Sequence, residues 1–247
     1  MYSRLGPWRY LQQFIGSTAF WLGATLLICL FLVPMWFTLL FPLKRRFQIA
    51  RQWNKSVLTW LKWTCGLGYR VEGREHLPET PCVILAKHQS TWETFSIFLE
   101  FAPTVYVLKR ELTWLPIFGW AIAPLHFISI DRSTGKKALN HILAQGKKCV
   151  ENQLHITIIP EGTRTSPGST HEYKKGGAIL AKSLNLPVVP IAHNAGQYWP
   201  KHSYIKLPGT ITVRVGLPID TTERSIHEIN ALTQSWIETQ MTELDKL

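Results

Sequence analysis

The sequence has little that would cross-link its chain or hold a metal ion. Its 247 residues include four cysteines, which are widely spaced and form no C-x-x-C pair: Cys29, Cys65, Cys82 and Cys149. This pattern favours reduced, buried thiols over disulfides or a zinc site. The G-x-x-x-x-G-K-S/T motif of phosphate-loop enzymes is absent, as is the G-x-S-x-G motif of serine esterases. These absences argue against both enzyme classes.

Acidic side chains are also scarce. Lysine and arginine number 27 against 16 aspartates and glutamates, which gives a net charge of +11. Such a charge indicates anionic partners, namely lipid headgroups, nucleic acid or phosphorylated substrates. We predict no nucleic-acid partner, because the sequence has no zinc spacing, aromatic RNA-binding block or helix-turn-helix pattern. A hydrophobic content of 46% with only 17% charged residues points instead to the membrane.

One long apolar run lies near the N-terminus. Residues 10–43 contain no charged side chain. A straight helix of this length would measure about 51 Å, well beyond the ~30 Å hydrocarbon core, so we expect it to tilt, break or turn back. Pro34 is the predicted break. The sequence leaves open a spanning helix over 14–33 and a pair of half-inserted helices meeting near Pro34.

Basic residues follow this run: Lys44, Arg45, Arg46, Arg51 and Lys55. The positive-inside rule therefore places the rest of the chain in the cytoplasm. Over residues 46–64, apolar side chains recur every three or four positions opposite basic ones. This spacing predicts an amphipathic helix at the membrane surface, and the alternative is a helix packed on the domain that follows.

Beyond residue 66, short apolar runs alternate with helical segments. The predicted strands are Val83–Ala86, Thr104–Leu108, Phe127–Ile130, Ile156–Ile159, Val188–Ala192 and Thr210–Val215. This alternation predicts an α/β fold with a mainly parallel sheet flanked by helices. A last helix is expected from about Ser225. We therefore divide the chain into a membrane-associated helical region, 1–65, and an α/β domain, 66–247.

The first of these strands leads to His88 and Glu93. Residues five apart do not face each other on a regular helix, so the two side chains meet only if His88 precedes the helix. Ser90 and Glu93 fit a capping box, which would start the helix at Thr91. His88 would then be a general base for a substrate hydroxyl, with Glu93 orienting its ring. The alternative is that Glu93 only caps the helix and His88 is structural.

Charged residues follow the later strands, at the sheet edge where ligands of α/β proteins gather. They are Lys109 and Arg110, Asp131 and Arg132, the segment 161–164, and the basic segment 173–177 with Lys174. Gly162 permits close backbone approach, and the Arg164 guanidinium suits phosphate. We expect a site for an anionic substrate here. The alternatives are an ordinary polar turn at 161–164 and a solvated helix start at 173–177.

Four motif blocks in order resemble one family. His88 to Glu93 is similar to an H-x4-D block, the segment 109–132 to a substrate-binding block, Ile159–Arg164 to F-P-E-G-T-R, and Val188–Ile191 to a final V-P-hydrophobic block. From about residue 70 to 220 the chain thus resembles the bacterial 1-acyl-sn-glycerol-3-phosphate acyltransferases, also called lysophosphatidate acyltransferases. The resemblance implies a glycerolipid acyltransferase-like fold.

The resemblance also implies a reaction: transfer of a fatty acyl group from an acyl-CoA or acyl-ACP (acyl carrier protein) thioester to the sn-2 hydroxyl of lysophosphatidate. It implies no metal and no bound cofactor, the thioester being a co-substrate. The expected partners are lysophosphatidate, the thioester donor and membrane lipids, at the cytoplasmic face of a bacterial inner membrane. The implied catalytic residues are His88 and Glu93. The expected acceptor pocket contains Lys109, Arg132, Glu161, Gly162, Thr163, Arg164 and Lys174.

Three residues depart from the family pattern: Glu93 stands for aspartate, Lys87 for asparagine and Ile159 for phenylalanine. Lys87 is expected to tune the adjacent base or to bind the acceptor phosphate. The departures leave other acceptors open, namely another lysophospholipid, lyso-ornithine lipid or glycerol-3-phosphate. Two rival functions are a basic membrane-surface binding module without chemistry and a hydrolase that uses water in place of the acceptor.

Overall fold

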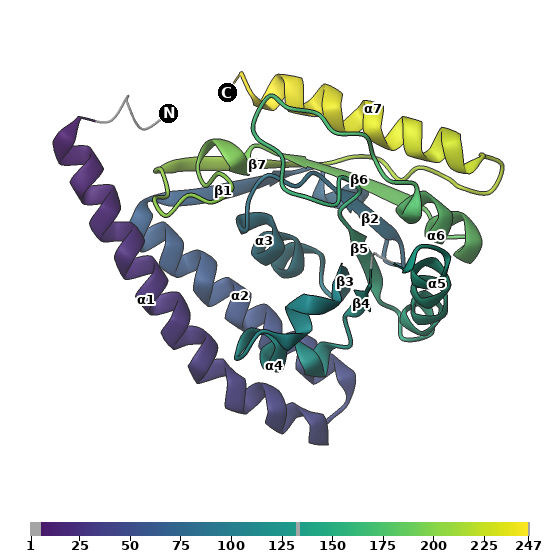
Figure 1. Cartoon of the computed structure of the whole chain (residues 1–247), viewed down its shortest axis with the longest axis horizontal. Helices are drawn as coiled ribbons and strands as arrows, with labels where there is room; N and C mark the ends of the chain where they lie inside the picture. Colours follow the sequence, from purple (N-terminus) through teal and green to yellow (C-terminus); the bar gives the residue numbers. More distant parts are fainter. Residues whose placement is uncertain (1–5, 132–133, 247) are drawn as a thin grey trace.

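The computed structural model describes residues 6–131 and 134–246, in which helices cover both faces of a seven-stranded sheet (Figure 1). The strands are β1 (Leu67–Glu72), β2 (Val83–Ala86), β3 (Thr104–Lys109), β4 (Ile128–Ile130), β5 (His155–Ile158), β6 (Val188–His193) and β7 (Gly209–Val215). The α-helices are α1 (Pro7–Phe37), α2 (Leu43–Cys65), α3 (Trp92–Phe101), α4 (Phe118–Ile122), α5 (Lys136–Glu151), α6 (Gly176–Leu184) and α7 (Ile226–Leu244).

The strand order is β1-β7-β6-β2-β5-β3-β4, and every neighbouring pair is parallel except β6 with β7. The predicted α/β class with a mainly parallel sheet is therefore confirmed. Each of the six predicted strands is present, with ends that differ by at most one residue. The sequence reading missed β1, which lies at the edge of the sheet beside β7.

The sheet centre is buried on both sides. All residues of β2, β5 and β6 are buried, because helices cover both faces there. Helix α3, with α1 and α2 outside it, lies on one side, whereas α5, α6 and α7 lie on the other (Figure 1). The ends of β2 and β5 thus open between two layers of helices.

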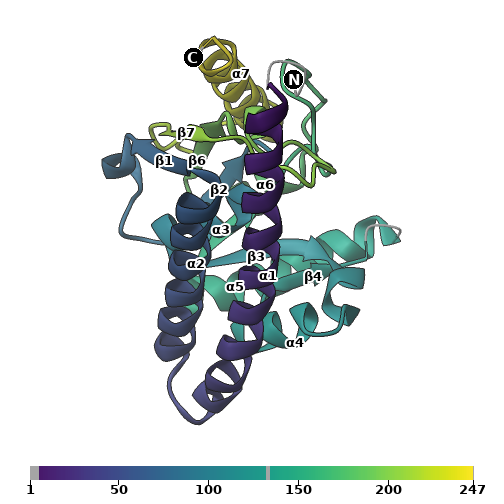
Figure 2. The same ribbon diagram turned by 90° about the vertical axis from the view of Figure 1, so that its left-hand side faces the viewer.

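Helices α1 and α2 form an antiparallel hairpin (Figure 2). Helix α1 continues three residues past Pro34, and the chain reverses between Thr38 and Pro42. The expected break at Pro34 is therefore wrong, and the turn lies at the next few residues. Gly16 makes close packing of the pair feasible, since a Cβ there would come within 2.2 Å of the Thr64 carbonyl oxygen.

The N-terminal half of α1 also packs on the segment that leads into β7. The Lys206 ammonium lies 3.9 Å from the centre of the Trp21 ring and 4.8 Å from that of Phe20. The Lys206 backbone N–H donates to Ser17 Oγ at 2.9 Å. Cation–π contacts of a desolvated ammonium are among the stronger ones. Helix α1 is thus held against the α/β domain as well as against α2.

The apolar face of α2 is covered by protein. Its buried residues are Phe47, Ala50, Asn54, Val57, Leu58, Leu61 and Cys65. Helices α1 and α3 and strand β1 pack on this helix. The structure thus shows the helix packed on the domain, which the sequence had left as the alternative to a helix on the membrane surface.

The described residues contain one helical stretch long and apolar enough to cross a membrane. It covers Pro7–Leu40, with a mean hydropathy of 2.2 and 11% of its most apolar window buried. The exposed side chains along it include Leu22, Leu26, Leu30 and Val33. Such a stretch is compatible with membrane association.

Candidate active site

His88 lies in the short loop between β2 and α3, in contact with Glu93. Its Nδ1 is 2.6 Å from Glu93 Oε1. The Glu93 side chain is completely buried, whereas that of His88 is 20% exposed and faces a cavity. Because a carboxylate accepts at Nδ1, this nitrogen carries the proton and the lone pair of Nε2 stays available. The pair predicted from the sequence is therefore brought together.

The start of α3 holds Glu93 in place. Its Oε1 also accepts the backbone N–H groups of Gln89, at 3.2 Å, and Ser90, at 3.1 Å. Ser90 Oγ accepts from the N–H of Trp92 and not from that of Glu93. Half of the expected capping box is thus present, and the helix begins at Trp92, one residue later than predicted. Glu93 both stabilises the helix start and orients the imidazole.

A second histidine, His193 at the end of β6, lies behind this pair. Its Nε2 is 2.8 Å from the Lys87 carbonyl oxygen, and its Nδ1 accepts the Ala195 N–H at 3.3 Å. Burial lowers the pKa of His193, which favours the neutral ring with its proton on Nε2. The sequence reading missed this residue.

The ionisation of Glu93 is set by the same neighbours. Burial opposes its charged form, but the imidazoles of His193 and His88 outweigh it and hold the Glu93 pKa below its ordinary value. His193 Nε2 lies 3.9 Å from Glu93 Oε2. Glu93 is therefore a carboxylate at neutral pH, which is the form that accepts the His88 Nδ1 proton.

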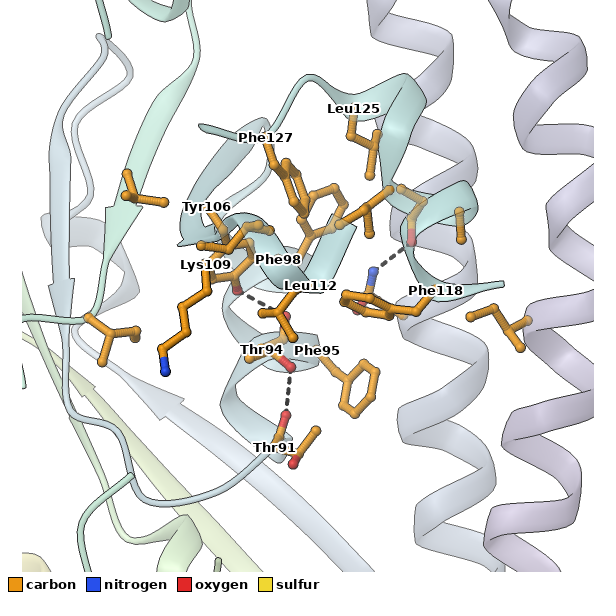
Figure 3. A pocket seen from close by; sticks show the side chains of 18 of the residues that line it. Thr91, Thr94, Phe95, Phe98, Tyr106, Lys109, Leu112, Phe118, Leu125 and Phe127 are labelled. Carbon is orange, nitrogen blue, oxygen red and sulfur yellow. Dashed lines mark hydrogen bonds between the residues drawn. The ribbon is translucent and has the colours of Figure 1, made fainter. Parts of the chain in front are cut away.

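The cavity beside His88 has a volume of about 510 Å³, within the ~300–1,000 Å³ typical of ligand sites. Helices α1, α2, α3 and α4 and strand β3 line it mainly with apolar side chains. Figure 3 shows Leu125 and Phe127 toward one end, and Thr91 and the ammonium end of Lys109 toward the other. The cavity thus joins an apolar space to a polar end.

Cations and small residues border the polar end. Lys109, Gly162, Thr163 and Arg164 all line the cavity, and Arg164 Nη1 donates to Thr91 Oγ1 at 3.0 Å. Gly162 has φ of 71°, in the left-handed region that favours glycine. Lys201 also lines the cavity, and no motif had indicated it. The arrangement gives an anionic group several positive partners close to His88.

Two predicted pocket residues, Glu161 and Lys174, lie elsewhere. Glu161 is buried behind the loop, where its Oε1 accepts the His88 N–H at 2.8 Å. Lys174 is exposed and is not among the described residues that line the cavity; its backbone N–H bonds to the Pro160 carbonyl. Arg132 lies outside the described residues. Glu161 therefore supports the loop that carries His88 and does not face the cavity.

This arrangement has the parts for acid–base chemistry on a substrate that is partly apolar and partly anionic. His88 offers a basic nitrogen at the border between an apolar cavity and a group of cations. Within residues 6–131 and 134–246, no group of three or more histidine, cysteine or acidic side chains is placed to hold a metal. A histidine in such surroundings is able to activate a substrate hydroxyl.

Comparisons with known proteins identify the family. Residues 68–194 match the family described as Acyltransferase. The chain is 43% identical over 210 residues to a 1-acyl-sn-glycerol-3-phosphate acyltransferase of Pseudomonas aeruginosa, covering 83% of this chain and 82% of that one. It is 31% identical to the Limnanthes douglasii protein of the same name, over 68% of this chain and 60% of that one. The chain therefore belongs to the acyltransferase family.

A solved structure has the same fold. The 1-acyl-sn-glycerophosphate (LPA) acyltransferase of Thermotoga maritima superposes with a TM-score of 0.81, covering 96% of this chain and 97% of that one. The two sequences are 22% identical. The match extends over nearly the whole chain and so includes the α1–α2 hairpin as well as the sheet.

Proposed function

We propose that this protein transfers a fatty acyl group from an acyl thioester to the sn-2 hydroxyl of 1-acyl-glycerol-3-phosphate, which gives phosphatidate. The observation that carries the proposal is the His88–Glu93 pair at the polar end of the apolar cavity, beside Lys109 and Arg164. The cavity suits an acyl chain and the cations suit a phosphate. Relatives named for this activity support the same acceptor.

In the proposed reaction, His88 Nε2 takes the proton of the acceptor hydroxyl as its oxygen attacks the thioester carbonyl. A tetrahedral oxyanion forms, and its collapse breaks the C–S bond. The imidazolium then returns the proton to the departing thiolate. The new ester C–O bond replaces the thioester bond, and Glu93 stabilises the transient positive charge on His88 through Nδ1. The donor is a co-substrate, either acyl-CoA or acyl-ACP, and no resident metal or cofactor enters the scheme.

A substrate panel tests the reaction and its acceptor together. Detergent-purified enzyme receives one labelled acyl thioester, as acyl-CoA or acyl-ACP, with lysophosphatidate, another lysophospholipid, lyso-ornithine lipid or glycerol-3-phosphate. Mass spectrometry identifies each product. We expect phosphatidate from lysophosphatidate at the highest rate. A higher rate with another acceptor would show that lysophosphatidate is not the preferred acceptor. Release of free fatty acid without any acceptor would indicate a hydrolase.

Arg164→Ala should discriminate between acceptors. Because hydrogen bonds to charged groups contribute about 1.5–3 kcal/mol, we expect kcat/KM for lysophosphatidate to fall roughly 10- to 100-fold. The loss with a monoacylglycerol acceptor, which lacks the phosphate, should be much smaller. Arg224→Ala is the matched control, since Arg224 donates to the Asp220 carbonyl just before α7. Equal losses of kcat/KM with both acceptors would show that Arg164 does not bind the acceptor phosphate.

We propose that the protein acts at the cytoplasmic face of a bacterial inner membrane. The exposed apolar stripe of α1 and the basic residues after it support this location. Exposed side chains also gather beyond β3, where Trp114 is 65% and Trp120 53% exposed. The Trp36 indole N–H of α1 donates to the Trp120 carbonyl at 3.0 Å, so the two apolar surfaces adjoin. Packing of α1 along the domain favours insertion into one leaflet over crossing.

The pair Trp114→Ser with Trp120→Ser should weaken membrane binding. Tryptophan side chains contribute apolar contact at the interface, so we expect a roughly 10-fold lower partition coefficient. Titration with vesicles that contain anionic lipid measures it. Leu217→Ser with Leu232→Ser is the control, because these exposed side chains lie just after β7 and on α7, away from α1 and α4. Unchanged partition of the tryptophan variant would exclude this segment from the membrane-binding surface.

A further inference from the structure

Lys87 precedes the catalytic histidine but does not share its surroundings. Successive side chains at the end of a strand point to opposite faces, so Lys87 is directed away from the cavity that His88 lines. The Lys87 side chain is only 1% exposed. Its backbone is fixed on both sides, by an N–H bond to the Ile191 carbonyl and by His193 Nε2 at its own carbonyl. A role in binding the acceptor phosphate does not fit this position.

The Lys87 ammonium instead lies between two carboxylates. Its Nζ is 2.8 Å from Glu238 Oε1 and 3.2 Å from Glu161 Oε2, and it donates to the Ser169 carbonyl at 3.3 Å. The Glu161 side chain is completely buried and that of Glu238 is 18% exposed. The Tyr173 hydroxyl donates to Glu238 Oε1 at 2.8 Å. A buried cation is thus paired with partners from two separate parts of the chain.

Glu161 connects this ion cluster to the base. While its Oε2 faces Lys87, its Oε1 accepts the backbone N–H of His88 at 2.8 Å. Thr165, four residues further on, holds the other side of the same residue: its N–H and its hydroxyl both donate to the His88 carbonyl, at 2.7 and 3.1 Å. The segment 161–165 therefore holds the His88 backbone at both its N–H and its carbonyl.

Without the Lys87 ammonium, Glu161 would no longer fix the His88 backbone. A buried carboxylate that loses its cation is strongly destabilised and either takes up a proton or moves toward water. Glu161 would then no longer keep its place under the His88 N–H. Glu238 would be left close to it with a second unpaired charge. Small displacements of a catalytic group are costly, since an error of about 1 Å is associated with rate losses on the order of 10²-fold.

We propose that Lys87 is a positioning residue, which holds Glu161 under the His88 amide, and that α7 contributes to the active site by supplying Glu238 to this cluster. The proposal rests on His88 being the base in the proposed function. It assigns to the C-terminal helix a part in catalysis although α7 does not line the cavity within the described residues. It also explains how lysine is accommodated at a buried position beside the base.

The test compares Lys87→Met, Glu238→Gln and the double variant by full kinetics, at a temperature well below the melting point of each. For Lys87→Met we expect kcat to fall roughly 10- to 100-fold with little change in the acceptor KM. The double variant should be several-fold more active than Lys87→Met alone, because it removes one of the two carboxylates left unpaired. Glu238→Gln alone should lower kcat less than Lys87→Met does, since Glu161 still pairs with Lys87.

Two matched controls separate catalysis from folding. Lys182→Met removes a lysine that tethers the segment before α7 by donating to the Thr221 and Thr222 carbonyls. Glu243→Gln removes another α7 glutamate, which pairs with Arg214. We expect both to leave kcat within about 2-fold of the parent, because their hydrogen-bond and ion-pair partners, Thr221, Thr222 and Arg214, lie outside the 161–165 segment.

The proposal is overturned if Lys87→Met lowers the melting temperature but leaves kcat unchanged, or if the double variant is no more active than Lys87→Met. If Lys87→Met does not fold, Glu238→Gln decides: an unchanged kcat in that variant would overturn the role of α7. The kinetics use whichever acceptor the parent protein acylates. If the parent protein does not acylate lysophosphatidate, the proposed function is contradicted. The Lys87 and Glu238 variants can still be compared with the acceptor that the parent does acylate.

Discussion

Replacing His88 by alanine is expected to abolish acyl transfer. The imidazole is the basic group at the polar end of the cavity, and its Nδ1 is engaged by Glu93 at 2.6 Å. General bases contribute about 10²- to 10⁴-fold to rates, so we expect a loss in kcat of at least this size. The measurement is the rate of phosphatidate formation from labelled thioester by purified protein in detergent.

The His88 variant should keep its fold and its membrane binding, because the ring is partly exposed and the loop is held through backbone atoms. His227→Ala on α7 is the matched control and should remain fully active. Circular dichroism and vesicle flotation show whether the protein is intact. Near-normal turnover of an intact His88→Ala protein would exclude His88 as the base.

Much of the sheet is predictable because its strands carry their own signals. β2 and β6 are buried on both faces, so β2 and residues 188–192 of β6 are continuous apolar runs. β1 carries a weaker signal: Leu67 is its only buried residue, and the strand is recognisable only from its pairing with β7, more than 140 residues later. Pairing over such distances leaves no local pattern.

The α1–α2 hairpin differs from what local sequence rules predict. Proline disfavours a helix interior, so a break at Pro34 was the natural prediction. Helix α1 nevertheless continues to Phe37, with Trp36 bonded to the Trp120 carbonyl and Met35 buried. Tertiary contacts outweigh the missing hydrogen bond of proline. The covering of α2 by α1 and α3 likewise depends on packing, which periodicity alone does not distinguish from a membrane surface.

The site was predictable only in part. The spacing of His88 and Glu93, together with Arg164 after a strand, was enough to place them at one edge. The motifs did not indicate which of their residues face the cavity. Glu161 belongs to a motif but lies behind the loop that carries His88. The alternation of side chains along a strand would have separated Lys87 from His88. No sequence pattern would have found Glu238, which lies 151 residues after Lys87.

Glu93 should be nearly as important as His88, and two substitutions separate its roles. Glu93→Gln keeps the size of the side chain but removes its charge, so the imidazolium formed during proton transfer loses its counter-ion and the required tautomer is no longer enforced. We expect kcat to fall on the order of 10²- to 10⁴-fold. Glu93→Asp keeps the carboxylate, which reaches less far toward Nδ1, and should retain substantially more activity.

The matched control for Glu93 is Glu100→Gln on the same helix, where Glu100 bonds to Tyr69 and Arg74 outside the cavity. It should affect stability more than turnover. Because Glu93 also accepts two backbone N–H groups at the start of α3, both Glu93 variants should lower the melting temperature. The melting temperature thus reports the helix start, and the ratio of the Gln and Asp activities reports the orienting charge. If Glu93→Gln were as active as the parent protein, only the role at the helix start would remain.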